Sequence, residues 1–233
     1  MPVKLRSALV RLTPLPEPFA QTRAALHLLA ERVISPAREQ ATGRIGLRPM
    51  HGGFGTPVFG SEEEIWVSGA LLFRQHIVIE AELPISSLLS AARFVGVDLQ
   101  GEDASLEVDE ESSLVLGEFY ALAARALEVV RSENAELDPS EVQLWPEHFD
   151  VATEIGIEAE GKRAGLGGSP GDEEHPEPYL YVLPWEKTRA QGPEWNATGF
   201  VGAELSYAAL VEAEDQLGVA TEFLRGRFAA VQD

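Results

Sequence analysis

Apolar residues recur at three- and four-residue spacing in three stretches of the chain, which predicts amphipathic helices. These stretches run from about Pro18 to Arg38, from about Ser113 to Arg131 and from about Glu204 to Val231. The last stretch also repeats Leu210, Leu217, Leu224 and Val231 at seven-residue intervals. A shorter helix is expected to start at Pro84, where Ser86 and Ser87 precede apolar residues. We interpret each apolar stripe as a face that packs on the core.

Strand-like segments fall into two groups along the chain. The first group comprises Arg44 to Met50, Thr56 to Phe59, Ile65 to Arg74 and His76 to Glu82. The second comprises Phe149 to Glu158, Lys162 to Leu166 and Pro178 to Trp185. The segment from Phe149 to Glu158 alternates apolar and polar residues, which is typical of an antiparallel strand with one covered face. The acidic run from Glu102 to Glu111 is expected to form a solvated hairpin or loop.

The order of these elements predicts an α+β fold. Helix, strands, helix, helix, strands and helix follow one another, and the regular β-α-β alternation of Rossmann and TIM-barrel folds is missing. We therefore expect mainly antiparallel sheets packed against long amphipathic helices. A single compact domain over residues 1–233 is the preferred organisation, with two sub-layers, 1–110 and 111–233, as the alternative.

Composition narrows the classes of function. The chain has no cysteine, so thiolate metal sites and cysteine nucleophiles are excluded. A formal net charge of -20 disfavours binding to nucleic acids and to anionic membrane surfaces. The apolar stretch Ala8 to Val10 is interrupted by Arg11, and a secretory signal needs about 7–15 apolar residues. We expect a cytoplasmic protein.

Gly167 to Gly171 matches the G-x-S-x-G pattern of a serine-hydrolase nucleophile elbow. The residue after the serine supplies a backbone N–H to the oxyanion hole in such enzymes, and here that residue is Pro170, which has none. A type II turn over Ser169, Pro170, Gly171 and Asp172 is the better interpretation.

A group of polar residues lies where the second set of strands begins. His148, Asp150 and Glu154 are separated by even intervals, so a strand would direct them to one face. His175 lies in the loop Gly167 to Pro178 and would reach them if the flanking strands pair beside this one. His148, Asp150 and His175 are thus candidate ligands of a divalent metal, with Glu154 as a catalytic base. The alternative is an ordinary solvent-facing side of a sheet.

Aromatic residues with polar tips follow the same loop. Tyr179, Tyr181 and Trp185 share one face of a strand, a pattern that suits a ligand pocket and also an ordinary half-buried sheet. The predicted ligand-binding set also contains Trp145, His51 and the three candidate metal ligands His148, Asp150 and His175. His51 precedes Gly52, Gly53 and Gly55, whose density indicates a close backbone approach, a bulge or a tight strand connection.

Parts of the chain resemble two known families. The segments Leu144 to Asp150, Gly168 to Asp172 and Pro176 to Val182 resemble a family of uncharacterised bacterial proteins. The layout of the N-terminal helix and glycine-bearing strands is loosely similar to domain of unknown function 5996. The resemblance implies that the patch is a family signature and implies no particular chemistry.

Three functions therefore remain open. The first is binding of a small molecule in a pocket formed by the Trp145 to Trp185 region. The second is a metal-dependent hydrolase that uses His148, Asp150 and His175. The third is an acidic module that binds a basic protein partner. The cofactor, with a divalent metal as the candidate, and the oligomeric state stay undetermined at this point.

Overall fold

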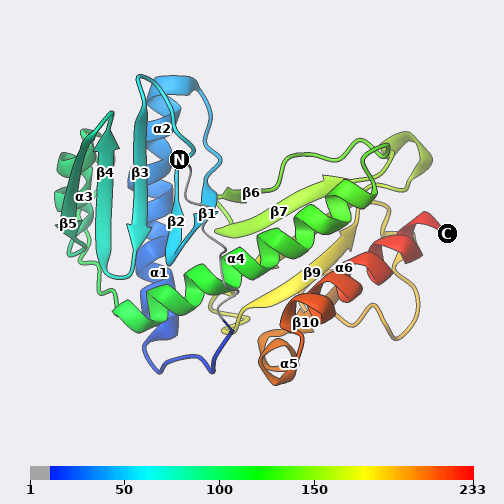
Figure 1. Cartoon of the computed structure of the whole chain (residues 1–233). Coiled ribbons are helices and arrows are strands. Elements are labelled where there is room, and N and C mark those ends of the chain that lie inside the picture. The colour runs from blue at the N-terminus through cyan, green and yellow to red at the C-terminus, as the bar shows by residue number, and fades with distance from the viewer. Residues whose placement is uncertain (1–10) are drawn as a thin grey trace, which may run out of the picture.

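The computed structural model describes residues 11–233, in which ten strands form two five-stranded antiparallel sheets (Figure 1). This agrees with the predicted α+β class. The stretch Ala8 to Val10, which we distinguished above from a secretory signal, lies outside these residues. Within residues 11–233, no helix is long and apolar enough to cross a membrane.

The first sheet has the strand order β1-β2-β3-β4-β5. Its strands are β1 (Arg48–Met50), β2 (Gly53–Gly55), β3 (Glu63–Ser68), β4 (Leu71–His76) and β5 (Ile79–Pro84). The prediction of one strand from Ile65 to Arg74 is wrong, because Gly69 adopts φ 57 and turns the chain into a hairpin. The predicted strand Thr56 to Phe59 is also wrong, since β2 precedes it. Strand β5 is an edge strand, and Ile79 to Glu82 are exposed.

The second sheet has the order β10-β9-β8-β7-β6. Its strands are β6 (Gln143–Trp145), β7 (Asp150–Ile155), β8 (Ala164–Ser169), β9 (Tyr179–Pro184) and β10 (Ala203–Ser206). Strand β8 extends to Ser169, into a stretch we had expected to be loop. A loop follows it, and the Ser169 hydroxyl accepts a hydrogen bond from the Gly171 amide at 3.1 Å. The strand-to-helix elbow of a serine hydrolase is therefore absent at Ser169.

The two sheets meet edge to edge at a single residue pair. Leu47 and Leu144 exchange backbone hydrogen bonds of 2.7 and 2.8 Å, and both side chains are buried. This bridge places β1 beside β6, so that residues from the first half of the chain lie close to the turn that follows β6.

The first predicted helix contains a π-helical turn. It divides into α1 (Phe19–Leu29), a π-helical segment η1 (Ala30–Ile34) and α2 (Ser35–Thr42), which Gly43 ends with φ 69. Pro36 explains the widened turn, because proline has no N–H and its ring clashes with the carbonyl four residues earlier. The predicted short helix is present as α3 (Leu88–Val95), but it begins at Leu88 rather than at Pro84, which is the last residue of β5. Ser87 caps it by accepting from the Ser90 amide.

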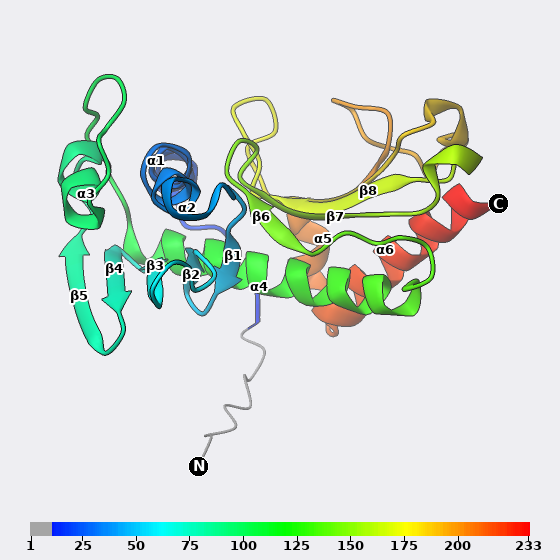
Figure 2. The same ribbon diagram turned by 90° about the horizontal axis from the view of Figure 1, so that it is seen from above.

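Helix α4 (Glu110–Glu133) runs beneath both sheets (Figure 2). Asp109 caps it by accepting from the Ser112 amide, so the end of the acidic run is helical rather than loop. A Cβ at Gly117 would lie 2.3 Å from the backbone nitrogen of Gly53. Glycines on both sides thus allow α4 and β2 to approach backbone to backbone, and this contact accounts for the glycine density after His51.

The predicted C-terminal helix from Glu204 to Val231 is wrong as a single element. The structure has β10 and then two helices, α5 (Tyr207–Glu212) and α6 (Gln216–Gln232). Ser206 and Asp215 each accept a hydrogen bond from an amide three residues later and start a new helix. The apolar spacing survives the break, because Leu210, Leu224 and Val231 are all fully buried.

One buried cluster contains residues of both sheets and of the helices that cover them. Helices α4 and α6 cover one face of the second sheet. On its other face, the loops that follow β8 and β9 rise above the strands (Figure 2). The candidate site lies on this second face.

Candidate functional site

A pocket of about 290 Å³ lies on the face of the second sheet that α4 and α6 leave open. It is lined by His148, Asp150, Ser169, Asp172, Tyr179, Tyr181, Leu183 and Phe200. Four of these residues, His148, Asp150, Tyr179 and Tyr181, belong to the ligand-binding set predicted from the sequence. The volume is at the small end of the roughly 300–1,000 Å³ that ligand pockets occupy.

Asp150 and Tyr181 form the centre of the pocket. The Tyr181 hydroxyl donates a hydrogen bond to Asp150 Oδ2, although β8 separates the strands that carry the two residues. Gly167 of β8 makes the contact fit, because a Cβ there would lie 2.4 Å from the Tyr181 ring. The Tyr181 ring therefore occupies the space that a side chain at this position would need.

The second carboxylate oxygen of Asp150 has no hydrogen-bond partner within residues 11–233. The residue is only 8% exposed. Burial raises the pKa of Asp150, and the hydrogen bond from Tyr181 acts in the opposite direction. Burial and the neighbouring Asp150 carboxylate raise the pKa of Tyr181 well above its ordinary value, so this hydroxyl keeps its proton at neutral pH.

The turn between β6 and β7 positions His148 and Asp150. Phe149, between them, has φ 55, a left-handed conformation that is uncommon for an aromatic residue. Three contacts hold it: its carbonyl accepts a hydrogen bond from Tyr120 of α4, its ring stacks on His27 of α1 at 5.1 Å, and Phe54 of β2 meets it edge-on. The sequence predicted His148 at the start of a strand, but the residue lies in the turn before β7.

Helix α1 also fixes the two backbone segments beside the pocket. His27 Nε2 lies 3.0 Å from the Pro146 carbonyl, and Arg23 Nη1 donates to the Pro176 carbonyl at 2.9 Å. These side chains are one helical turn apart, so a single helix face holds the β6–β7 turn and the β8–β9 loop. His27 thus has a structural role, since it contacts both the Pro146 carbonyl and the Phe149 ring.

Within the β8–β9 loop, Asp172 organises the backbone around His175. Its Oδ1 accepts from the amides of Glu174 and His175 at 2.8 and 2.7 Å. The His175 ring packs on Tyr179 with centroids 4.2 Å apart, and its Nε2 lies 3.6 Å from Glu204 Oε1. His175 therefore supports the wall of the pocket from behind Tyr179.

The predicted metal ligands do not form a metal-binding group. Among the residues that the structure describes, no group of three or more histidine or acidic side chains is arranged to hold a metal ion. His175 turns to Tyr179 and Glu204, while Asp150 turns to Tyr181. A shared site at His148, Asp150 and His175 is therefore not assembled.

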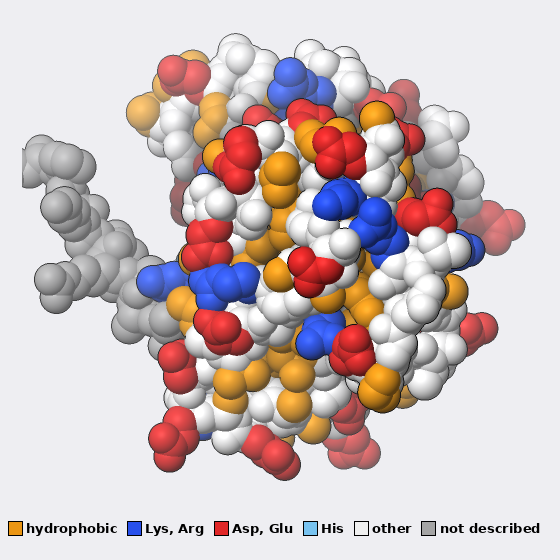
Figure 3. Space-filling view, turned by 90° about the vertical axis from the view of Figure 1, so that its right-hand side faces the viewer, with side chains coloured by type: hydrophobic (Ala, Val, Ile, Leu, Met, Phe, Trp, Pro, Cys, Tyr) orange, Lys and Arg blue, Asp and Glu red, His pale blue; other side chains and the backbone are white. Residues whose placement is uncertain are grey.

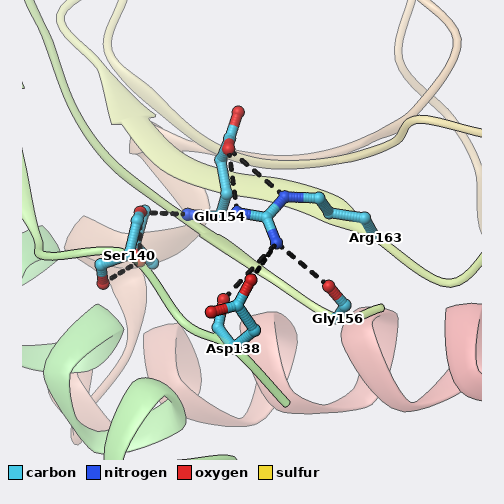
Figure 4. Close-up of polar contacts among 6 residues, drawn as sticks. Asp138, Ser140, Glu154, Gly156 and Arg163 are labelled. Atoms are coloured by element: carbon cyan, nitrogen blue, oxygen red, sulfur yellow. Dashed lines mark hydrogen bonds and ion pairs between the residues drawn. The ribbon is translucent and has the colours of Figure 1, made fainter. Parts of the chain in front are cut away.

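The proposed catalytic base Glu154 lies on the same strand but outside the pocket lining. Its Oε2 accepts from Arg163 Nε and Nη2 at 3.3 and 3.2 Å (Figure 4). Arg163 also contacts Asp138 and donates to the Gly156 carbonyl at 3.1 Å. Glu154 is thus paired with Arg163 outside the pocket rather than placed to act on a molecule inside it.

Three other predicted ligand-binding residues do not line the pocket. His51 lies in the turn between β1 and β2, near Glu118 of α4. Trp185 is 46% exposed and carries the guanidinium of Arg163 over its ring at 5.3 Å. Trp145 pairs with Asp150 in the ladder between β6 and β7. The predicted pocket therefore included these three residues in error.

Sequence reasoning missed Phe200 and Glu204. Phe200 comes from the loop before β10, and its ring centroid lies 6.3 Å from that of Tyr179 and 6.1 Å from that of Tyr181. Glu204 is the β10 partner of Tyr181 in the ladder. The sequence offered one signal for Phe200: it is the one aromatic residue in the glycine-containing segment Ala197 to Gly202.

The acidic excess is not gathered into one patch on the face at the C-terminal end of α6. Figure 3 shows basic side chains interspersed with acidic and hydrophobic ones on this face. A pattern of mixed charge is what a solvated surface presents. This face therefore offers no specific support for the acidic interaction module.

No protein-family profile, no curated protein and no solved structure matches this chain.

Proposed function

We propose that this protein binds a small molecule in the pocket on the open face of its second sheet. The observation that carries the proposal is Asp150, a carboxylate almost removed from water that lines a cavity and keeps one oxygen without a hydrogen-bond partner within residues 11–233. A buried polar group in this state costs free energy, and such groups are concentrated at functional sites.

The composition of the walls supports the same proposal. Tyr179, Tyr181 and Phe200 supply aromatic surface, and Ser169 and Asp172 supply polar groups at the rim. A mostly apolar concavity with a few fixed polar groups is what small-molecule sites present. The loops that bear Asp172 and Phe200 come from separate parts of the chain, so the fold has to be complete before the pocket exists.

A ligand screen tests the proposal. The library contains cationic, neutral and anionic molecules of similar size, and the measurement is the change in backbone amide chemical shifts of the full chain. We expect hits whose shifts centre on Asp150, Tyr179 and Phe200. Binding should weaken about tenfold in Phe200→Ser, since the ring forms one wall, and should be unchanged in Trp185→Ser, which alters an exposed aromatic residue outside the pocket.

The proposal is overturned if no compound binds at concentrations up to about 10 mM, where even weak fragments are detected. It is equally overturned if every hit binds Phe200→Ser as well as it binds the unaltered chain.

A further inference from the structure

The charge of the pocket lining points to the kind of molecule that fits it. Asp150 and Asp172 are in the lining, and neither lysine nor arginine is among its residues. Glu204, directly across the ladder from Tyr181, is mostly buried and adds a third carboxylate beside the wall. An anionic ligand would bring a like charge against a buried carboxylate, whereas a cation would neutralise it.

Two of these carboxylates each keep one oxygen without a donor. Asp150 Oδ1 and Glu204 Oε2 are buried and have no hydrogen-bond partner within residues 11–233. Asp150 Oδ2 already accepts from Tyr181, so the acceptor capacity that remains on this carboxylate is on Oδ1, which is itself buried. A ligand that carries N–H donors and a positive charge supplies what this carboxylate lacks, as a charge-assisted hydrogen bond.

The aromatic rings provide the second half of a cation site. The Phe200 ring stands at 78° to that of Tyr181 and at 24° to that of Tyr179. In the near-perpendicular pair the edge of one ring meets the face of the other, so a cation beside these rings lies over the face of one ring rather than between two faces. Attraction of a cation to an aromatic face is effective within about 6 Å of the ring centroid.

We propose, on the basis of the small-molecule site described above, that the occupant of the pocket is a small organic ammonium. Its nitrogen lies against Asp150, and its carbon skeleton packs between Tyr179, Tyr181 and Phe200. A primary ammonium fits best, because it carries the hydrogen-bond donors that Asp150 lacks. The cavity volume of about 290 Å³ limits the skeleton to a single ring or a short chain.

Three probes of nearly equal shape separate charge from size. Benzylamine is a cation at neutral pH, benzyl alcohol is neutral and benzoate is an anion. Isothermal titration calorimetry on the full chain should give a dissociation constant for benzylamine at least about tenfold lower than for benzyl alcohol, with benzoate weakest. In Asp150→Asn the preference for the amine over the alcohol should fall to within about threefold, while the alcohol binds as before. Asp138→Asn, an exposed carboxylate outside the pocket, should change neither value.

A second variant keeps the inference testable if Asp150→Asn does not fold. Phe200→Leu lies in a surface loop and keeps apolar volume, but it removes an aromatic face, so it should weaken benzylamine more than benzyl alcohol. The inference is overturned if benzyl alcohol or benzoate binds as tightly as benzylamine, or if none of the three binds. Hits of other charge in the library screen, mapped to the same pocket, would leave the small-molecule proposal standing while the ammonium assignment fails.

Discussion

The hydroxyl of Tyr181 reaches Asp150 across strand β8, and Gly167 is the residue that allows it to pass. The two residues are on β9 and β7, so their contact requires a position without a side chain on β8, the strand between them. The hydrogen bond at the centre of the pocket therefore depends on a glycine, a residue without a side chain.

Gly167→Ala should open this contact. The new Cβ would collide with the Tyr181 ring, so the ring must move and the hydrogen bond to Asp150 is lost. We expect the free energy of unfolding to fall by about 1–3 kcal/mol in urea denaturation, the usual cost of overpacking. Gly165→Ala is the matched control on the same strand, because its Cβ would meet only a carbonyl at 4.0 Å. Equal losses in the two variants would contradict the proposed packing of the ring.

Tyr181→Phe should change the titration of Asp150. The hydroxyl lowers the pKa of this carboxyl while burial raises it, so removal of the hydroxyl should raise the pKa further. The side-chain carbon signal of Asp150, followed by NMR during a pH titration, reports the shift. Tyr207→Phe loses a hydrogen bond of 2.8 Å to the Thr13 carbonyl, away from the pocket, and should leave the pKa of Asp150 unchanged. An unaltered Asp150 titration in Tyr181→Phe would be incompatible with the contact.

The stability of Asp150→Asn relative to the unaltered chain should increase as the pH rises. Because burial raises the folded-state pKa of Asp150 above its unfolded value of about 3.9, the fold loses stability as this carboxyl ionises. Asparagine does not ionise. The difference in unfolding free energy, variant minus unaltered chain, should therefore grow from pH of about 4 up to the folded-state pKa and then level off.

Asp109→Asn is the control of opposite sign. Hydrogen bonds from Ser112 lower the pKa of Asp109, so its ionised form stabilises the fold above its unfolded pKa and that contribution disappears as the pH falls. Asparagine also caps helices well, so α4 should stay intact. The two pH profiles should slope in opposite directions, and parallel slopes would argue against the environment described for Asp150.

Arg23→Met should loosen the loop between β8 and β9. The variant keeps the apolar stem of the side chain but loses the hydrogen bond to the Pro176 carbonyl. Hydrogen exchange of the Glu174 and His175 amides should accelerate, because Asp172 holds them only while the loop is in place. Arg32→Met, which releases carbonyls at Gln100 and Glu102 instead, should leave those amides unchanged. Identical exchange in both variants would show that α1 does not anchor the loop.

The sequence was sufficient for the fold class and for the helix faces, because apolar spacing records which residues are buried. It was insufficient for β2, β6 and β10, which are three or four residues long and offer too few positions for an alternating pattern. The break between α5 and α6 was missed for a related reason. Asp215 starts a new helix, but the seven-residue apolar repeat continues across it.

The candidate site shows the same division. His148, Asp150, Tyr179 and Tyr181 could be selected from strand periodicity, and the structure places all four in the pocket lining. The partners of each residue could not be read in this way. Asp150 contacts Tyr181 rather than His175 because of Gly167. This pairing depends on sheet register and on diagonal contacts, which local periodicity does not encode.

The exposed edge of the first sheet bears on how this protein behaves at high concentration. Strand β5 leaves backbone groups open to pairing with another chain, and Val78 beside it is 88% exposed. Glu80 and Glu82 project from this edge, so two copies that approach each other there bring carboxylates together. That repulsion fades as the pH falls toward about 4.3, the ordinary pKa of glutamate. Storage in mildly acidic buffer should therefore favour self-association through β5, whereas neutral buffer should keep the copies apart.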